Sequence, residues 1–263
     1  MNDEPLPIKS LGQHWLNDPE TLNSICDLAE INNRDTVLEV GPGLGSLSDY
    51  LVDRAKKVIA VEFDDHLADM LKVKFVNHAN MEVINQDIRK YDLRQLEFGY
   101  KCVANIPYYL TSYLIRLLSE SINPPAMAVL LIQREVAQRL SAQPGQLSVI
   151  AVITQVFWEI ELGTVVPRKL FLPPPEVDSQ IIKLVRRKDN LVSNDTQKIF
   201  FQTVRVGFSQ KRKTLANSLS SGFRITKAQA QQFLDQAEIN PKSRPQELSI
   251  EDWQRLTIAI HNK

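Results

Sequence analysis

The chain has few of the residues that mark secreted, metal-stabilised or membrane-spanning proteins. Only two cysteines occur among its 263 residues, Cys26 and Cys102, and they lie far apart in apolar surroundings, which is typical of buried free thiols in a reducing cytoplasm. The four histidines have no metal-ligand spacing with cysteine, so we predict no metal site. The longest uninterrupted apolar run, Ala126–Ile132, is far too short to span a bilayer. The first ten residues contain no apolar core of signal-peptide type, so we expect a cytoplasmic protein without a membrane partner.

The chain also lacks net charge, but its charges are unevenly distributed. Basic and acidic residues are equal in number, at 31 each. Between Lys183 and Lys227, however, there are eleven Lys and Arg and only two acids, which leaves this segment with an excess of nine positive charges. Because screening makes neighbouring charge matter most, a local basic face on a neutral protein can still bind phosphates.

Short apolar runs rich in Val and Ile alternate with amphipathic stretches from about residue 20 to residue 185. Strands are predicted at Thr36–Val40, Lys57–Glu62, Met81–Asn85, Lys101–Ile106 and Ala126–Ile132, and helices at Leu47–Arg54, Asp64–Phe75, Thr111–Leu118 and Glu135–Leu140. This alternation predicts an α/β fold with a parallel sheet covered by helices on both faces. Two further strands are predicted near Val149–Trp158 and Asp178–Val185, and the proline-rich loop Phe171–Pro175 between them must be extended.

The pattern changes after about residue 189. Strand-like alternation stops, and helical periodicity is found in Thr196–Phe208, Lys227–Ala237 and Ile250–Ile260. We therefore place a boundary near residues 188–193, which separates a first domain, residues 1–189, from a small all-α C-terminal domain, residues 190–263.

A glycine-rich loop, Glu39–Gly45, follows the first predicted strand and precedes a helix. Glycines such as Gly41 and Gly43 let the backbone turn sharply and approach a ligand, whose polar groups meet N–H groups at the helix start. Glu62 ends the second strand, where a carboxylate can bind ribose hydroxyls, and Asp87 follows the third, where it can accept a bond from an adenine amino group. The loop has the spacing G-x-G-x-G rather than the G-x-G-x-x-G of dinucleotide sites, so the set favours S-adenosylmethionine.

The alternative is a tight turn with scattered surface acids. A lone glycine loop would leave the two interpretations roughly even, because short motifs often match by chance. Three such elements at successive strand ends favour the binding site.

The tetrapeptide Asn105-Ile106-Pro107-Tyr108 ends the fourth strand and carries the predicted chemistry. The amino nitrogen of adenine is a poor nucleophile because its lone pair is delocalised into the ring. The Asn105 side-chain oxygen and the Ile106 carbonyl can accept its N–H bonds and favour a pyramidal nitrogen. Tyr108 can stack on the base, a contact worth roughly 1–3 kcal/mol. The alternative is that Asn105 caps the helix that begins near Thr111.

With these residues in place, the chain resembles the KsgA family of ribosomal RNA adenine dimethyltransferases along nearly its whole length. Besides the motifs above, the segments that carry the resemblance are Gly12–Leu16, Gln133–Leu140, Phe171–Ser179, Phe208–Leu219 and Arg244–Ser249. The resemblance implies a Rossmann-like class I methyltransferase domain. It also implies transfer of four methyl groups, two to each of two adjacent adenosines near the 3′ end of small-subunit (16S) rRNA, during ribosome biogenesis.

The resemblance also implies roles for single residues. Gln13, His14 and Leu16 would contact the cofactor, although bacterial members usually carry Asn-Phe where this chain has His14-Trp15. Histidine can still offer a ring nitrogen, and the alternative is that His14 caps the following helix. Phe171 would flank the target base opposite Tyr108, as in enzymes that flip a base out of its stack, although core packing is the commoner fate of such a residue.

The basic segment is the predicted RNA contact. The run Lys211-Arg212-Lys213 lies within it, and phosphate contact is the favoured interpretation over a merely solvated face. Arg134 and Arg139 could extend that surface, but an ion pair with Glu135 is equally plausible. We expect a monomer that binds 30S rRNA or an assembly intermediate.

Three other functions remain as alternatives. The related Erm-type enzymes share the loop and Asn-x-Pro-Tyr but modify large-subunit rRNA, and the segment Lys211–Leu219 resembles the small-subunit enzymes instead. A non-catalytic assembly or transcription factor would not need to keep Asn105, Tyr108, Glu62 and Asp87, although an assembly-checkpoint role can coexist with catalysis. A nicotinamide dehydrogenase would need a hydride-acceptor site, which we do not find.

Overall fold

The computed structural model describes residues 12–210 and 213–261 of the chain. These residues form two compact units, and each is described here by itself. The first unit contains the described residues up to Ala137 together with Glu159–Arg186, and the second contains Gln138–Trp158 together with the described residues from Arg187 onward. The domain boundary expected after residue 189 stays a prediction.

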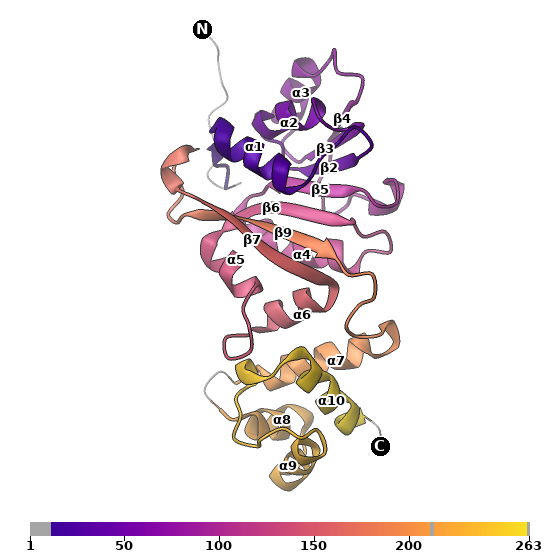
Figure 1. Ribbon diagram of the computed structural model, residues 1–263, viewed down its shortest axis with the longest axis vertical. Helices are drawn as coiled ribbons and strands as arrows, with labels where there is room; N and C mark the ends of the chain where they lie inside the picture. Colours follow the sequence, from indigo (N-terminus) through magenta and orange to yellow (C-terminus); the bar gives the residue numbers. More distant parts are fainter. Residues whose placement is uncertain (1–11, 211–212, 262–263) are drawn as a thin grey trace. The chain divides into compact units, whose positions relative to one another are not determined.

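The first unit is built on a seven-stranded sheet with the strand order β4-β3-β2-β5-β6-β9-β7 (Figure 1). Its strands are β2 (Thr36–Val40), β3 (Lys57–Glu62), β4 (Met81–Asn85), β5 (Lys101–Asn105), β6 (Met127–Gln133), β7 (Trp158–Val166) and β9 (Ser179–Arg186). β2, β3, β4, β5 and β6 pair in parallel, whereas β9 runs antiparallel to β6. The expected α/β sheet is therefore confirmed, and it is mixed rather than wholly parallel.

The order of the strands creates a crevice at one edge of the sheet. From β2 the chain moves outward to β3 and β4, and then returns to β5 on the other side of β2. Ligands of open α/β sheets bind where the strand order reverses in this way, outside the carboxyl ends of the strands. The ends of β2 and β5 are adjacent at this point.

Helices connect these strands and cover the two faces of the sheet (Figure 1). They are α1 (Pro19–Leu28), α2 (Ser46–Val52), α3 (Asp65–Lys74), α4 (Thr111–Glu120) and α5 (Arg134–Leu140), with 3-10 turns at Leu93–Gln95, Tyr108–Leu110 and Arg168–Leu170. α1 begins where it does because the Asp18 side chain accepts the backbone N–H of Thr21 at 2.9 Å and Pro19 occupies the first turn. The equivalent cap of α3 is Asp64.

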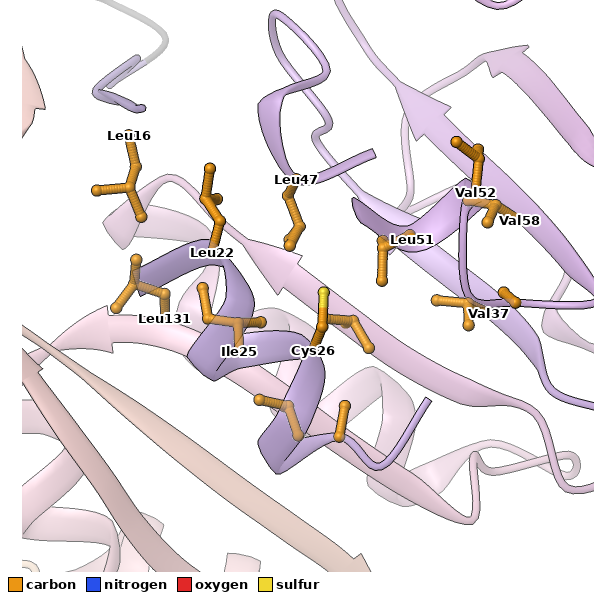
Figure 2. Close-up of a cluster of buried hydrophobic side chains, with 14 of the residues drawn as sticks. Leu16, Leu22, Ile25, Cys26, Val37, Leu47, Leu51, Val52, Val58 and Leu131 are labelled. Atoms are coloured by element: carbon orange, nitrogen blue, oxygen red, sulfur yellow. The ribbon is translucent and has the colours of Figure 1, made fainter. Parts of the chain in front are cut away.

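The core of the first unit lies between the sheet and helices α1 and α2 (Figure 2). Leu22, Ile25 and Cys26 of α1 are fully buried against side chains of α2 and of the strands, among them Leu51 and Val37. Both cysteines are free and buried, as expected. Burial raises the pKa of both thiols to about 12, so neither is a ready nucleophile.

The second unit is helical. Its elements are α6 (Val149–Phe157), α7 (Asn194–Gly207), α8 (Leu215–Phe223), α9 (Lys227–Gln236), a 3-10 turn at Pro245–Glu247, and α10 (Ile250–His261). Trp253 of α10 is fully buried and stacks on Phe208, with ring centroids 5.6 Å apart. Gly207 is required at this point, because a Cβ there would lie only 2.3 Å from the Trp253 ring.

The strand predicted at Val149–Trp158 is wrong, because residues Val149–Phe157 form helix α6. A short apolar run rich in β-branched residues cannot be distinguished from a buried helix by its periodicity alone. The Ser148 side chain caps the helix by accepting the backbone N–H of Ala151. The strand in this region, β7, begins only at Trp158.

Candidate active site

The glycine loop joins β2 to α2 and lines a pocket of the first unit. Gly41, Gly43 and Gly45 have φ angles of 66°, 61° and 76°, a left-handed conformation that costs other residues energy. The Gly41 backbone N–H donates to the Val61 carbonyl at 3.0 Å, which ties the loop to β3. A side chain on Gly43 would approach Trp15 at 3.5 Å and fill part of the pocket wall.

Glu62, at the end of β3, is the buried carboxylate beside this loop. It is only 6% exposed. Its Oε2 accepts the Gly43 backbone N–H at 3.0 Å, and its Oε1 accepts the Asp64 backbone N–H at 2.9 Å. Burial raises the pKa of Glu62, and these backbone hydrogen bonds act in the opposite direction. The Phe63 backbone N–H is a third donor to this carboxylate, which has about four lone-pair sites and so keeps one for a ligand hydroxyl.

Glu39, near the end of β2, is a second carboxyl group that lines the pocket. It is 1% exposed, and the Ser48 hydroxyl donates to its Oε2 at 2.6 Å. Burial raises the pKa of Glu39 to about 8, an effect that the Ser48 hydrogen bond reduces and the nearby Glu62 charge increases. At neutral pH the group is therefore mostly protonated and can donate as well as accept.

Asp87 follows β4 and lines the same pocket, but Arg89 occupies its carboxylate. The Arg89 side chain donates to both oxygens at 2.5–2.9 Å, and the Arg89 backbone N–H donates to Oδ1 at 2.9 Å. These bonds lower the pKa of Asp87. The carboxylate is ionised and in the expected place, with a cation already bound to it.

Asn105 ends β5 and lies in the pocket with Ile106, Pro107 and Tyr108. It caps no helix, because the residue before α4 is Leu110, which makes no side-chain cap. Among the described residues, the Asn105 side-chain amide has no hydrogen-bond partner. Its oxygen is thus available to a ligand.

The Tyr108 ring is held from two sides. Its hydroxyl forms a hydrogen bond with the Ser179 hydroxyl at 2.8 Å, and its ring stacks on that of His14, with centroids 5.9 Å apart. Burial raises the pKa of Tyr108, which keeps the phenol neutral. These contacts orient the ring in the pocket wall.

The N-terminal segment of the site is fixed by a short sheet. β1 (Trp15–Leu16) pairs antiparallel with β8 (Phe171–Leu172), with Leu16 opposite Phe171. His14 does not cap α1, because Asp18 does so; the His14 Nδ1–H instead donates to the Pro173 carbonyl at 2.8 Å. Its tautomer is assigned from that carbonyl partner.

Phe171 lines the pocket but also belongs to the hydrophobic core. It is 3% exposed and packs in the cluster that includes Leu16 and Leu22. The position of Phe171 therefore fits both contact with the target base and packing in the core. Its role beside the target base stays a prediction.

The pocket brings together nearly all the residues predicted from the sequence. It is lined by Gln13, His14, Leu16, Gly41, Gly43, Glu62, Asp87, Asn105, Ile106, Pro107, Tyr108 and Phe171. Of the predicted RNA-binding residues, Lys211 and Arg212 lie outside the described residues. Lys213 is exposed in the second unit.

The pocket residues that the sequence analysis did not single out as site residues include Trp15, Phe63, Arg89 and Tyr109. Phe63 follows Glu62 directly, Tyr109 follows Tyr108, and both are more than half exposed. Their place in the sequence beside Glu62 and Tyr108 could have pointed to them, since an exposed aromatic ring next to a predicted site residue is a candidate for ligand contact.

Two other features are absent from the part of the chain that the structure describes. Over residues 12–210 and 213–261, no three His, Cys, Asp or Glu side chains gather into a group that could hold a metal ion. No helix in those ranges is both long and apolar enough to cross a membrane.

The sheet order, the glycine loop and the polar residues at successive strand ends define a class I methyltransferase fold. The chain belongs to the ribosomal RNA adenine dimethylase family, whose model matches residues 8–262. This confirms the resemblance noted in the sequence.

Two relatives are each 40% identical to this chain and are named ribosomal RNA small subunit methyltransferase A. The protein from Dehalococcoides mccartyi matches over 95% of this chain and 87% of its own length. The protein from Streptococcus equi subsp. zooepidemicus matches over 96% of this chain and 91% of its own.

Two solved structures are similar over nearly the whole chain. A dimethyladenosine transferase from Plasmodium falciparum is 28% identical with a TM-score of 0.80, covering 92% of this chain and 96% of that one. The 23S rRNA methyltransferase ErmE is 30% identical with a TM-score of 0.76, covering 93% and 98%.

Proposed function

We propose that this protein transfers methyl groups from S-adenosylmethionine to the N6 amino groups of two adjacent adenosines near the 3′ end of small-subunit rRNA. The observation that carries the proposal is the Asn105 amide, which has no partner among the described residues and lies in one pocket with the carboxylates of Glu62 and Asp87. The relatives named small subunit methyltransferase A support the choice of RNA.

The residues of the pocket fit this cofactor. Glu62 is a buried carboxylate with a free lone-pair site for a ribose hydroxyl, and Asp87 would accept the adenine amino group. Phe63 and Ile88, which follow these acids, offer apolar surface to the adenine ring. The absence of a Cβ on Gly43 leaves open the space next to Trp15. When bound, S-adenosylmethionine supplies an electrophilic methyl group on a sulfonium sulfur.

The chain's own task is to make the adenosine amino group nucleophilic and to hold it in place. The Asn105 side-chain oxygen and the Ile106 carbonyl would accept the two amino N–H bonds. The Tyr108 ring, fixed by Ser179 and His14, would stack on the base. Positioning of this kind can supply much of a rate enhancement without a covalent intermediate. Phe171 would close the other side of the base.

The test is methyl incorporation into under-methylated 30S particles by the wild type and by Asn105→Ala. We expect the variant to lose activity by a factor on the order of 10²–10³, as when one preorganised polar group is removed from an active site. Asn33→Ala, a substitution of an exposed asparagine, is the matched control and should remain active. Equal incorporation by Asn105→Ala and the wild type would remove Asn105 from the mechanism.

The similarity to ErmE makes the large subunit the alternative substrate. Supplying isolated 30S and 50S particles separately decides between them, and activity on 50S alone would refute the proposal. We also propose that the protein acts as a monomer in the cytoplasm, on 30S or an assembly intermediate, with Lys211, Arg212 and Lys213 among its RNA contacts. The excess of basic residues between Lys183 and Lys227 supports those contacts.

A further inference from the structure

Three N–H groups of Arg89 donate to the carboxylate of Asp87. Oδ1 accepts the backbone N–H and the Nε–H of Arg89, and Oδ2 accepts the shared Nε–H and an Nη2–H, all within 2.9 Å. A carboxylate has about four lone-pair sites, two on each oxygen. Three donors leave at most one of these sites open, so the Arg89 side chain and an adenine amino group compete for the Asp87 carboxylate.

The Arg89 side of this pair faces solvent. The Arg89 side chain is 55% exposed and the Asp87 side chain 12%, so a guanidinium that leaves the carboxylate regains its hydration. Once released, the guanidinium remains at the mouth of the pocket, which Arg89 itself lines together with Tyr109. The phenols of Tyr109 and Tyr113 also lie near this guanidinium.

The surroundings of the released cation suit a nucleic-acid strand. Tyr109 is 64% exposed and directly follows Tyr108, the residue that would stack on the target base. Tyr113 lies one helical turn further on, with the Arg116 guanidinium 5.8 Å from its ring centroid. Exposed aromatic rings interleaved with arginine are the usual surface for bases and phosphates of a single strand.

We infer that Arg89 is exchanged between two partners: it pairs with Asp87 until the adenine amino group of the cofactor displaces it, and it then binds a phosphate of the RNA strand beside Tyr109. Cofactor binding would thereby strengthen RNA binding, and by linkage RNA would strengthen cofactor binding by the same factor. This inference rests on the proposed function.

The chain contains a matched control for this exchange. Asp92 and Arg94 form the same pair two residues apart, with Arg94 donating to both carboxylate oxygens at 2.8–3.1 Å. Local backbone geometry is thus enough to form such a pair. Of the two pairs, Asp87 and Arg89 line the pocket that holds Glu62 and Asn105. Arg94 lies instead with Tyr113 and Arg116, so its replacement controls for a cation lost near the strand without affecting the exchange.

The experiment uses the full-length wild type, Arg89→Met and Arg94→Met. The affinity for S-adenosylhomocysteine is measured by calorimetry. The affinity for a fluorescent single-stranded oligoribonucleotide with two adjacent adenosines is measured by anisotropy, with and without saturating S-adenosylhomocysteine. In the wild type and in Arg94→Met, saturating S-adenosylhomocysteine should tighten RNA binding about fivefold or more. It should also steepen the salt dependence by about one phosphate contact.

In Arg89→Met the RNA affinity should be the same with and without S-adenosylhomocysteine. S-adenosylhomocysteine itself should bind at least as tightly as to the wild type, because its internal competitor is gone. Retention of the full enhancement in Arg89→Met, or weaker binding of S-adenosylhomocysteine to it, would overturn the inference. Failure of the proposed function is a separate result, since the wild type would then not methylate 30S, whether or not it binds S-adenosylhomocysteine.

Discussion

The buried carboxyl group of Glu39 makes the stability of the protein depend on pH in a defined direction. In the unfolded chain this group titrates near its ordinary pKa of 4.5, whereas in the folded protein burial raises the pKa to about 8. Between these values the folded protein holds a proton that the unfolded chain has released. Raising the pH therefore favours unfolding, and the contribution of Glu39 falls by about 1.4 kcal/mol per pH unit.

Glu39→Gln removes this titration while keeping an oxygen that can accept the Ser48 hydroxyl. Between pH 5.5 and 7.5 the wild type should lose about 3 kcal/mol of unfolding free energy that the variant keeps, two pH units at about 1.4 kcal/mol each. The measurement is urea unfolding, followed by circular dichroism at several pH values in this range.

Glu82→Gln is the control for loss of a carboxylate in the same sheet. Glu82 lies in β4, half-exposed and paired with Lys57, so its replacement should leave the pH dependence of the wild type intact. If Glu39→Gln and the wild type lose stability with pH at the same rate, the carboxyl of Glu39 is ionised when folded and the reasoning from burial is refuted.

Three further predictions concern the pocket and the second unit. Glu62→Gln should weaken S-adenosylhomocysteine binding by about 10- to 100-fold, since a hydrogen bond to a charged group is worth about 1.5–3 kcal/mol; calorimetry measures it. Tyr108→Phe loses only the hydrogen bond to Ser179 and should lower kcat/KM on 30S less than about tenfold. Tyr108→Ala loses the ring as well, and with it about 1–3 kcal/mol of stacking on the base. Gly207→Ala should destabilise the protein by about 1–3 kcal/mol and lower its Tm, because the new Cβ overlaps Trp253.

Each of these predictions has a result that contradicts it. Unchanged S-adenosylhomocysteine affinity in Glu62→Gln would remove that carboxylate from the cofactor site. Equal activities of the Phe and Ala variants at Tyr108 would show that the ring does not stack on the base. In the second unit, Gln202→Ala changes an exposed residue of α7 and should leave the Tm unchanged. An equal shift of the Tm in Gly207→Ala and Gln202→Ala would rule out the overlap with Trp253 as the cause.

The fold and most of the site could be predicted because their determinants are local in the sequence. Glu62 and Asn105 end strands whose apolar runs are easy to identify, and parallel strands bring their carboxyl ends to one edge. The glycine loop fits the same argument, since Gly41 and Gly43 adopt the left-handed conformation that such a loop requires.

What could not be predicted depends on tertiary contacts or on competition between side chains. The run Val149–Phe157 has the composition of a strand, and only its burial and the Ser148 cap make it a helix. The pairing of β1 with β8 involves two residues on each side, too few to leave a periodic pattern. The occupation of Asp87 by Arg89 was also invisible, because the sequence shows which groups are near but not which partner each one takes.

The pairing of β1 with β8 has a consequence for the order in which the protein assembles during synthesis. It joins the segment that begins the site, Trp15–Leu16, to Phe171–Leu172, and nearly the whole sheet is encoded between them. Contacts between such distant segments close late, because the entropy of a long loop must be lost first. A nascent chain can therefore form the β2, β3 and β4 region, with Glu62 and the glycine loop in place, well before Phe171 has emerged. The pocket is completed only when most of the first unit has been translated, so a truncated product would not present a finished catalytic site.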